Sequence, residues 1–253
     1  MIRIDKGDAP ATLVSSGGRI LTRYKVLYDN DQAAYVNGKP FVFGHQYASQ
    51  PVKNRLKARQ YDKCCFSEAK FNGDYPDVEH FRPKGRTDLL GTKNSLYPGY
   101  YWLAYEWSNL FYCKAIINCT YKRNFFPLAD ETQRNRSHHD THIESPMIID
   151  PSLEDPRIHI GFHEDEIKPL TEKGRFNIEF LGLRDPTFVA GRNRLFKLLK
   201  LVKTTAEGMI KIGYPLNHPA VADLLAELKA AMQPDAEFSS MAIDLLQGWP
   251  HIQ

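Results

Sequence analysis

The stretch DYPDVEHFRPKGR, residues 74–86, places an acidic residue directly before a histidine, Glu79-His80. Neighbouring residues of a β-strand point to opposite faces, but at a strand end or a bulge they can converge on one site. The pair would then combine a hard oxygen ligand for a cation with a general base that titrates near neutral pH. The alternative is a structural Glu-His pair in an ordinary sheet, which is the commoner case for an isolated dipeptide.

Later residues supply the partners that such a site needs. Asn109 and Asn118 follow the pair, and NCTYK, residues 118–122, predicts the start of a short helix on which Asn118 and Lys122 share a face. Asn118 then offers a second oxygen to a cation. A positive rim, which a phosphodiester substrate requires, is predicted from Arg82, Lys84, Arg86, Lys122 and Arg123.

Three other segments have simpler predicted roles. GYYWLAYEWSNLFYC, residues 99–113, is rich in Trp and Tyr, and we expect core rather than a platform for stacking bases. SQPVKNRLKARQYDK, residues 49–63, predicts a basic helix with a solvated face, which is favoured over a DNA contact. SHHDTH, residues 137–142, predicts a polar loop, although His138 and His142 would share a face on a helix and could bind a metal.

The last third of the chain predicts two short strands and two helices. GRFNIEFLGL, residues 174–183, alternates like a strand, and another strand is expected around residues 147–149. PAVADLLAELKAAM, residues 219–232, predicts an amphipathic helix. NRLFKLLKLVK, residues 193–203, predicts a second one, with an apolar stripe formed by Leu195, Leu198, Leu199 and Val202.

Composition is that of an ordinary globular protein. The 253 residues are 42% hydrophobic and 25% charged, enough to bury a real core. The net charge of +3 is too mild to indicate nucleic-acid binding by itself. No apolar run is long enough to span a bilayer and the start lacks a signal-peptide core, so we expect a cytoplasmic protein without membrane contact.

Several of these segments together resemble the HNH endonuclease superfamily, whose site is a ββα-metal finger. The resemblance rests on DVEHFRPK (77–84), GYYWLAYEWSNLF (99–111) and NCTYKRNFFPL (118–128). More narrowly, they resemble the PtuB-type HNH nucleases of Septu and retron anti-phage defence systems. SPMIIDPSLEDPRIHIGF, FNIEFLGLRDPTFVAGR and EFSSMA extend the likeness, so that it covers about Tyr61 to Met241. It implies an α+β fold in which a ββα-metal finger is embedded in a mostly helical body.

The resemblance also implies roles for individual residues. His80 matches the catalytic histidine that activates water, and Asn109 matches the asparagine that steadies the histidine segment. Glu79 and Asn118 match the metal ligands, so a divalent cation, Mg²⁺ or Mn²⁺, is expected as the cofactor. The predicted substrate-binding residues are Arg82, Lys84, Lys122 and Arg123.

Many relatives carry a structural zinc held by two C-x-x-C pairs, and this chain departs from that pattern. Of the four positions in register, Cys64 is a cysteine, whereas Ser67, Lys114 and Ile117 are not. Thiolate zinc sites tolerate little ligand loss. We therefore predict that the structural zinc is absent and that apolar packing replaces it. An irregular site made of all four cysteines is the alternative; the off-register ones are Cys65, Cys113 and Cys119.

The function expected on these grounds is that of a metal-dependent HNH endonuclease that cuts DNA as the effector of a bacterial anti-phage defence system. The alternatives are an RNA-cutting or nicking HNH nuclease and a non-cleaving nucleic-acid-binding scaffold. The resemblance implies an ABC-type ATPase subunit as partner. This chain has no Walker A motif of its own, so any ATP dependence is expected to come from elsewhere. We expect an N-terminal segment (1–60), a nuclease core (61–130) and a C-terminal mixed then helical region (131–253).

Overall fold

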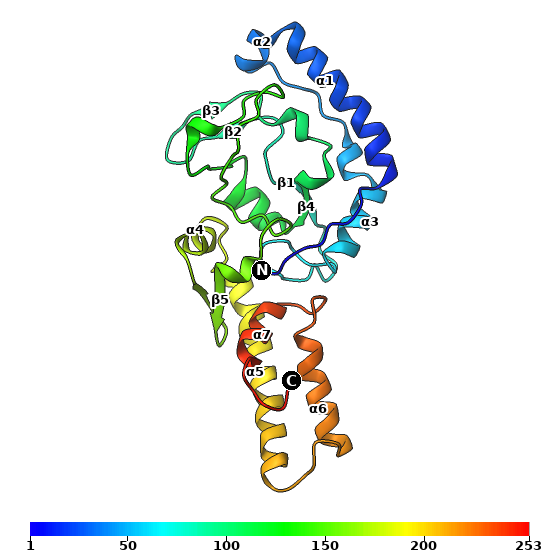
Figure 1. The fold of residues 1–253 in the computed structure, drawn as a ribbon, viewed down its shortest axis with the longest axis vertical. Coiled ribbons are helices and arrows are strands. Elements are labelled where there is room, and N and C mark those ends of the chain that lie inside the picture. The colour runs from blue at the N-terminus through cyan, green and yellow to red at the C-terminus, as the bar shows by residue number, and fades with distance from the viewer. Residues whose placement is uncertain (253) are drawn as a thin grey trace.

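The structure is a computed structural model, and it describes residues 1–252. The fold is α+β, as predicted, with a rounded body and a helical arm that projects from it (Figure 1). The α-helices are α1 (Gly18–Asn30), α2 (Gln32–Val36), α3 (Gln50–Arg59), α4 (Glu172–Phe180), α5 (Pro186–Lys211), α6 (Pro219–Ala231) and α7 (Ser239–Leu246).

Short helical turns and small sheets make up the rest of the body. The turns are η1 (Leu13–Gly17), η2 (His45–Ala48), η3 (Tyr101–Leu103), η4 (Trp107–Asn109), η5 (Ile116–Lys122), η6 (Glu131–Gln133) and η7 (Pro156–Ile158). The strands are β1 (Asp77–His80), β2 (Thr87–Asp88), β3 (Ser95–Leu96), β4 (Leu110–Cys113), β5 (Ile160–His163) and β6 (Glu166–Pro169). They form three antiparallel pairs, β1–β4, β2–β3 and β5–β6.

The Glu79-His80 pair lies at the end of β1. In the ladder with β4, Glu79 is opposite Phe111 and His80 is opposite Leu110. All four residues of β4 are buried, and the chain then enters η5, a single turn of π-helix. β1, β4 and η5 therefore form one unit in space, although β2, β3, η3 and η4 intervene along the chain. That this unit is an HNH metal finger stays a prediction.

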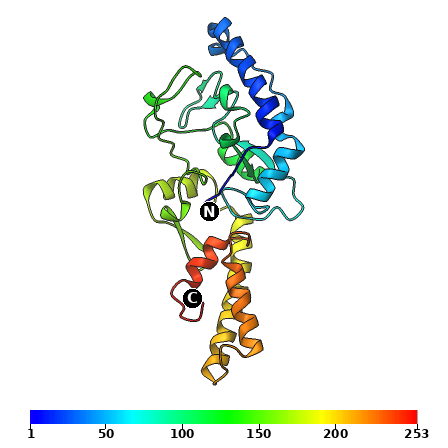
Figure 2. The same ribbon diagram turned by 45° about the vertical axis from the view of Figure 1, so that its right-hand side comes forward.

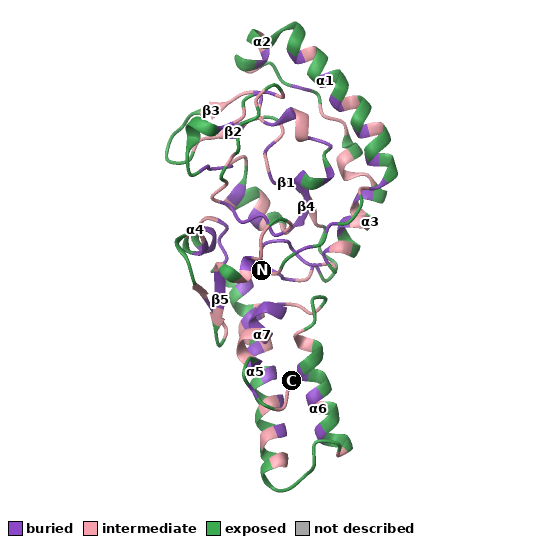
Figure 3. Cartoon of the chain, in the orientation of Figure 1, coloured by how far each residue is buried: buried purple, intermediate pink, exposed green. Residues whose placement is uncertain are grey.

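The aromatic segment after β3 forms the core of the body, as predicted. Tyr100 and Tyr101 are among the most deeply buried side chains. Tyr101 stacks on Tyr28 of α1 and on Phe41, at ring-centroid distances of 5.1 and 4.7 Å. Figure 3 shows buried residues around β1 and β4 and exposed residues along the outer side of α1. This core includes residues from all three segments of the expected domain division.

The projecting arm has a small core of its own. α5 has 26 residues, a length of about 39 Å at 1.5 Å per residue, and packs beside α6 and α7 (Figure 2). Leu199 and Val202 of α5 face Val221 and Leu228 of α6 within this second core. Leu198 was wrongly predicted to lie on the same stripe. Its side chain is 48% exposed.

The strand predicted over residues 174–183 is wrong, because this segment forms α4. Thr171 caps the helix by accepting a hydrogen bond from the N–H of Gly174 at 3.1 Å. Gly174, Asn177 and Ile178 are the buried residues, and their i, i+3, i+4 spacing is that of a helix face. The apparent alternation came from Phe176 and Phe180, which stack on each other with ring centroids 5.0 Å apart.

The strand predicted around residues 147–149 is also absent from the described structure. Ile148 and Ile149 are fully buried, but the backbone pairing there is limited to an isolated antiparallel bridge between Pro146 and Leu128, and a side chain bonds the residues that follow. Asn177 accepts a hydrogen bond from the N–H of Ile149 at 2.9 Å and donates to the carbonyl of Met147 at 2.8 Å. One buried amide thus satisfies two buried backbone groups of a loop.

The substitution Asn177→Ala is expected to lower the free energy of unfolding by about 2 kcal/mol, because it leaves those backbone groups without a partner. Urea denaturation followed by circular dichroism measures this loss. Asn54→Ala, at an exposed position of α3, is the control and is expected to change the value by less than about 0.5 kcal/mol. Equal effects of the two substitutions would contradict the assigned role of Asn177.

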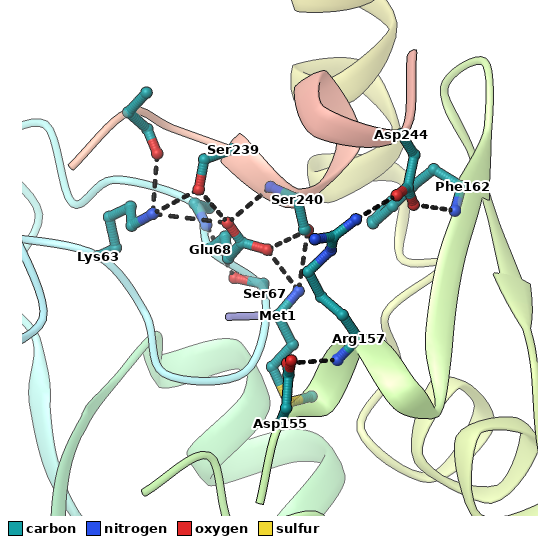
Figure 4. Close-up of polar contacts among 12 residues, drawn as sticks. Met1, Lys63, Ser67, Glu68, Asp155, Arg157, Phe162, Ser239, Ser240 and Asp244 are labelled. Carbon is teal, nitrogen blue, oxygen red and sulfur yellow. Dashed lines mark hydrogen bonds and ion pairs between the residues drawn. The ribbon is translucent and has the colours of Figure 1, made fainter. Parts of the chain in front are cut away.

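A buried polar network joins α7 to the segment after α3 (Figure 4). The carboxylate of Glu68 lies at its centre and pairs with the amino groups of Met1 and Lys63. It also accepts hydrogen bonds from the hydroxyl groups of Ser239 and Ser240 on α7. Burial alone would raise the pKa of Glu68, but these two ammonium groups and the hydroxyl donors lower it to about 2. The arm is therefore held to the body by charge as well as by packing.

A second ion pair extends the junction on the other side of α7. Arg157 contacts Asp244 at 2.7 Å, and the second oxygen of Asp244 accepts the N–H of Phe162 in β5 at 2.8 Å (Figure 4).

Among residues 1–252, no helix combines the length and the apolarity needed to cross a membrane.

Candidate functional site

A cleft of about 890 Å³ opens on the body beside β1 and contains the Glu79-His80 pair. Its walls come from the segment around η2, from α3, from β1 with the loop after it, and from η5. The charged and amide side chains in its lining are Lys53, Asp77, Glu79, Lys84, Arg86, Asn118, Arg123 and Asn124. Acidic groups on the strand thus meet basic groups on the surrounding loops and helices.

The helical turn η5 lies along β1, and two of its side chains contact two side chains of the strand. Asn118 donates a hydrogen bond from Nδ2 to a carboxylate oxygen of Asp77 at 2.9 Å. Four residues later, Lys122 forms an ion pair with Glu79. Asp77 and Glu79 are two apart on a strand and point to one face, and Asn118 and Lys122 are four apart on a helix and share a face. The predicted pairing of Asn118 with Lys122 on one face is therefore correct.

The ion pair between Glu79 and Lys122 is buried. Glu79 is 4% exposed and Lys122 is 0% exposed. Burial raises the pKa of Glu79, and the positive charge of Lys122 opposes that rise. Lys122 also donates a hydrogen bond to the carbonyl of His80 at 3.1 Å. The prediction that Lys122 contacts substrate is thus corrected: a fully buried ammonium group neutralises Glu79 and supports the backbone at His80.

His80 is held in one tautomer at the wall of the cleft. Its Nε2 lies 2.9 Å from the carbonyl oxygen of Ala104, which can only accept, so Nε2 carries the proton and Nδ1 carries the lone pair. The ring edge packs against Tyr47, with centroids 4.6 Å apart. Burial and the nearby charge of Lys84 hold the pKa of His80 well below its usual range. The side chain is therefore neutral at pH 7, as a general base must be.

Asn109 does not line this cleft, but it fixes the chain that follows His80. Its Oδ1 accepts the N–H of Arg82 at 2.7 Å, and its Nδ2 donates to the carbonyls of Arg82 and Leu103 at 3.0 and 3.1 Å. Its own carbonyl accepts the N–H of Phe81 at 2.9 Å. The position is that of a residue that steadies the histidine segment, rather than one that touches the reacting atoms.

Arg82 lies away from the cleft, and its predicted substrate contact is corrected. Its guanidinium pairs with Glu144 at 2.9 Å and lies over the ring of Phe126 at 4.9 Å. Lys84 and Arg123 do line the cleft, together with Arg86. Lys84 Nζ stands 3.4 Å from Nδ1 of His80 and 4.5 Å from the centre of the Tyr47 ring.

The substitution Lys84→Ala is expected to raise the pKa of His80, because removal of a like charge 3.4 Å away favours the imidazolium form. An NMR titration of the His80 ring signals measures the change. Lys93→Ala removes an exposed lysine outside the lining of the cleft and serves as the control. A His80 pKa that stays the same or falls in the Lys84 variant would contradict the described contact.

The oxygen atoms beside His80 are of the type that binds a hard divalent cation. Glu79 and Asp77 offer carboxylate oxygens, and Asn118 offers an amide oxygen, because its NH₂ group already donates to Asp77. Oxygen ligands of this type suit Mg²⁺ or Mn²⁺. The pair with Lys122 uses Oε1 of Glu79. The metal-ligand roles of Glu79 and Asn118 stay predictions.

Three of the four cysteines converge below β4. The sulfur atoms of Cys64, Cys65 and Cys113 lie within 4.8 Å of one another, and all three residues are buried. Cys119 is exposed and contacts Asp77 at 3.6 Å, so a site made of all four cysteines is wrong. Ile117 is fully buried and belongs to the same hydrophobic core as the three cysteines. The absence of a structural zinc stays a prediction.

Sequence reasoning missed Lys53, Tyr47 and Asp77 as residues of the cleft. Lys53 belongs to α3, which is the predicted basic helix; of its four basic residues only Lys57 is exposed, and the other three are partly buried, so the predicted solvated face is observed only in part. Asp77 carried a usable signal, because it stands two residues before Glu79 and so faces the same side of the strand. Tyr47 lies more than thirty residues before His80 and carried no such signal.

Comparison with known proteins gives one informative likeness. The chain is 28% identical over 234 residues to a protein named Septu protein PtuB from Bacillus mycoides (strain KBAB4). The aligned part is 90% of this chain and 79% of that protein. No family model matches the chain, and no solved structure matches it. The likeness to Septu protein PtuB thus covers most of the chain.

Proposed function

We propose that this chain is a metal-dependent HNH endonuclease that hydrolyses phosphodiester bonds of DNA as the effector of an anti-phage defence system. The observation that carries the proposal is the state of His80. This histidine is neutral, has its tautomer set by the carbonyl of Ala104, and stands in a cleft beside oxygen donors and basic side chains. A hydrolase acting on phosphodiesters needs these three components within one site.

In the proposed mechanism, Nδ1 of His80 accepts a proton from the attacking water. The hydrogen bond from Nε2 to Ala104 stabilises the imidazolium that results, because the carbonyl dipole faces the positive ring. Asn109 keeps the following residues, Phe81 and Arg82, in place during this step. A divalent cation bound by Glu79 and Asn118, with Asp77 beside them, would supply charge stabilisation for the leaving oxygen.

Basic side chains around the cleft would hold the phosphates of the substrate. Lys53 comes from α3, Lys84 and Arg86 come from the loop after β1, and Arg123 follows η5, so basic residues of three segments surround the acidic strand. Contacts of this kind are independent of sequence and weaken as salt increases. The proposed substrate contact is therefore with the sugar-phosphate backbone, and DNA is preferred over RNA only by the family resemblance.

The role in defence is supported by the likeness to Septu protein PtuB over 90% of this chain. We further propose, from the same likeness and the family resemblance, that an ABC-type ATPase subunit partners the chain and licenses cleavage. The chain has no Walker A motif, so any ATP dependence would come from that partner. The arm is the candidate contact surface, because Leu198 and Leu201 of α5 are large apolar side chains left exposed on it.

The test is a cleavage assay on plasmid DNA, single-stranded DNA and single-stranded RNA, with Mg²⁺, Mn²⁺ or EDTA. The assay is run with and without the proposed ATPase partner. The expected result is metal-dependent cleavage of DNA that EDTA abolishes. Cleavage of RNA alone would replace the substrate class, and binding without cleavage under every condition would favour the scaffold function.

A further inference from the structure

A cluster of two histidines and one aspartate lies outside the cleft. Asp29 belongs to the last turn of α1, and His138 and His139 belong to the polar loop between η6 and residue 145. Nε2 of His139 stands 2.7 Å from one carboxylate oxygen of Asp29, and Nε2 of His138 stands 3.5 Å from the other. The segment is a loop, as predicted, but His139 and not His142 joins His138 in the cluster.

The distances are those of a ligand set for a small metal ion. The two Nε2 atoms and the carboxylate oxygens all lie within 4.8 Å of one another. Around a tetrahedral zinc ion with bonds of about 2.0 Å, the ligand atoms stand about 3.3 Å apart. The observed separations bracket that value, so small side-chain rotations bring all three donors to one ion. Imidazole nitrogen combined with a carboxylate suits zinc better than Mg²⁺ or Ca²⁺.

A neighbouring tyrosine orients the inner histidine. The hydroxyl group of Tyr101 hydrogen-bonds to Nδ1 of His138. When Nδ1 carries the proton and donates it to that hydroxyl oxygen, Nε2 is left with a free lone pair toward Asp29. Metal-bound histidines generally have their second nitrogen anchored in this way. Burial and the adjacent His139 lower the pKa of His138.

The charges around the cluster favour a bound cation, with the exception of one positively charged side chain. Asp29 sits at the C-terminal end of α1, where the helix dipole favours positive charge. Lys25, one turn earlier, is the opposing group and lowers the pKa of His138. Asp140 also lies in this loop, but its carboxylate accepts the N–H groups of Arg136 and Ser137. His139 is 56% exposed at its side chain, so the cluster is open to solvent on one side.

We propose that Asp29, His138 and His139 bind a zinc ion through one carboxylate oxygen and the two Nε2 atoms, with a fourth position open to water. The ion clamps the end of α1 to the loop that also carries Glu144, the partner of Arg82. The site is separate from the cleft and from the three buried cysteines. Its binding does not depend on the proposed nuclease activity.

The test is zinc binding to the intact chain, measured by calorimetry and by NMR of the histidine ring signals. The variants are His139→Ala and Asp29→Asn, whose side chains are exposed enough for the fold to survive. His142→Ala removes an exposed histidine of the same loop and is the matched control. Since loss of an outer-shell partner alone costs 10–100-fold in metal affinity, loss of a ligand is expected to weaken zinc binding by at least about 100-fold.

The expected result has two parts. Wild type and His142→Ala bind one zinc ion that shifts the ring signals of His138 and His139, and both ligand variants lose that binding. Equal binding by all four proteins would place the zinc elsewhere, such as at the cysteines, and would overturn the proposal. Absence of binding by the wild type at 100-fold excess zinc, or loss in only one of the two ligand variants, would overturn it as well.

Discussion

The substitution His80→Ala is expected to lower metal-dependent cleavage by about 10²–10⁴-fold, the usual contribution of a positioned general base. Alanine removes the lone pair of Nδ1 and the hydrogen bond from Nε2 to Ala104, so no group remains to take the proton of the attacking water. Substrate binding should change little, because the phosphate contacts are proposed for the basic residues around the cleft. The measurement is single-turnover plasmid cleavage, with DNA binding followed in EDTA.

Two controls separate chemistry from folding in this experiment. His163→Ala changes an exposed histidine of β5, far along the chain from the cleft, and should retain the wild-type rate. Thermal unfolding of the His80 variant shows whether the loss of its buried hydrogen bond has disturbed the body. A folded His80→Ala protein that cuts at the wild-type rate would remove His80 from the mechanism.

Glu68→Ala is expected to destabilise the protein by about 3–5 kcal/mol, the usual cost of breaking a buried ion pair by removing one partner. The substitution leaves the amino groups of Met1 and Lys63 buried without their carboxylate. It also removes the acceptor of the two serine hydroxyls on α7. Urea denaturation measures the loss, and Glu172→Ala, at an exposed position of α4, is the control with an expected effect below about 0.5 kcal/mol.

The same carboxylate predicts how stability depends on pH. The pKa of Glu68 is lowered from 4.5 to about 2 in the folded protein, so its contribution to stability is fully present above pH 4.5. That contribution is lost as the pH falls from 4.5 toward 2. The wild type should therefore lose more stability over this window than Glu68→Gln, which cannot titrate. Parallel pH profiles for the two proteins would contradict the described network.

The parts of the fold that could be predicted are those in which the spacing of apolar residues along the sequence matches the spacing of the buried positions. The apolar residues of α6 recur every three or four positions and do face the second core. The segment of residues 174–183 failed because its two phenylalanines mimic strand alternation, whereas the decisive signals were the cap at Thr171 and the buried amide of Asn177. A buried polar residue that serves a distant loop has no local pattern.

The candidate site was predictable where its residues are close in the chain or matched to a motif. His80, Glu79 and Asn118 do meet at one cleft. The direction of charged side chains was not predictable, because Arg82 and Lys122 look like phosphate ligands until their partners Glu144 and Glu79 are located. Asp29 and His139 are 110 residues apart and meet only because α1 packs against the aromatic core.

The 26 residues of α5 are shared by two hydrophobic cores, one in the body and one in the arm. Phe188 and Phe196 anchor its first half in the body, and Leu199 and Val202 anchor its second half in the arm. The far ends of α5 and α6 pack in the arm core, which contains no residue of β1 or β4. One continuous helix thus links that core to the junction with α7, where Glu68 accepts hydrogen bonds from Ser239 and Ser240.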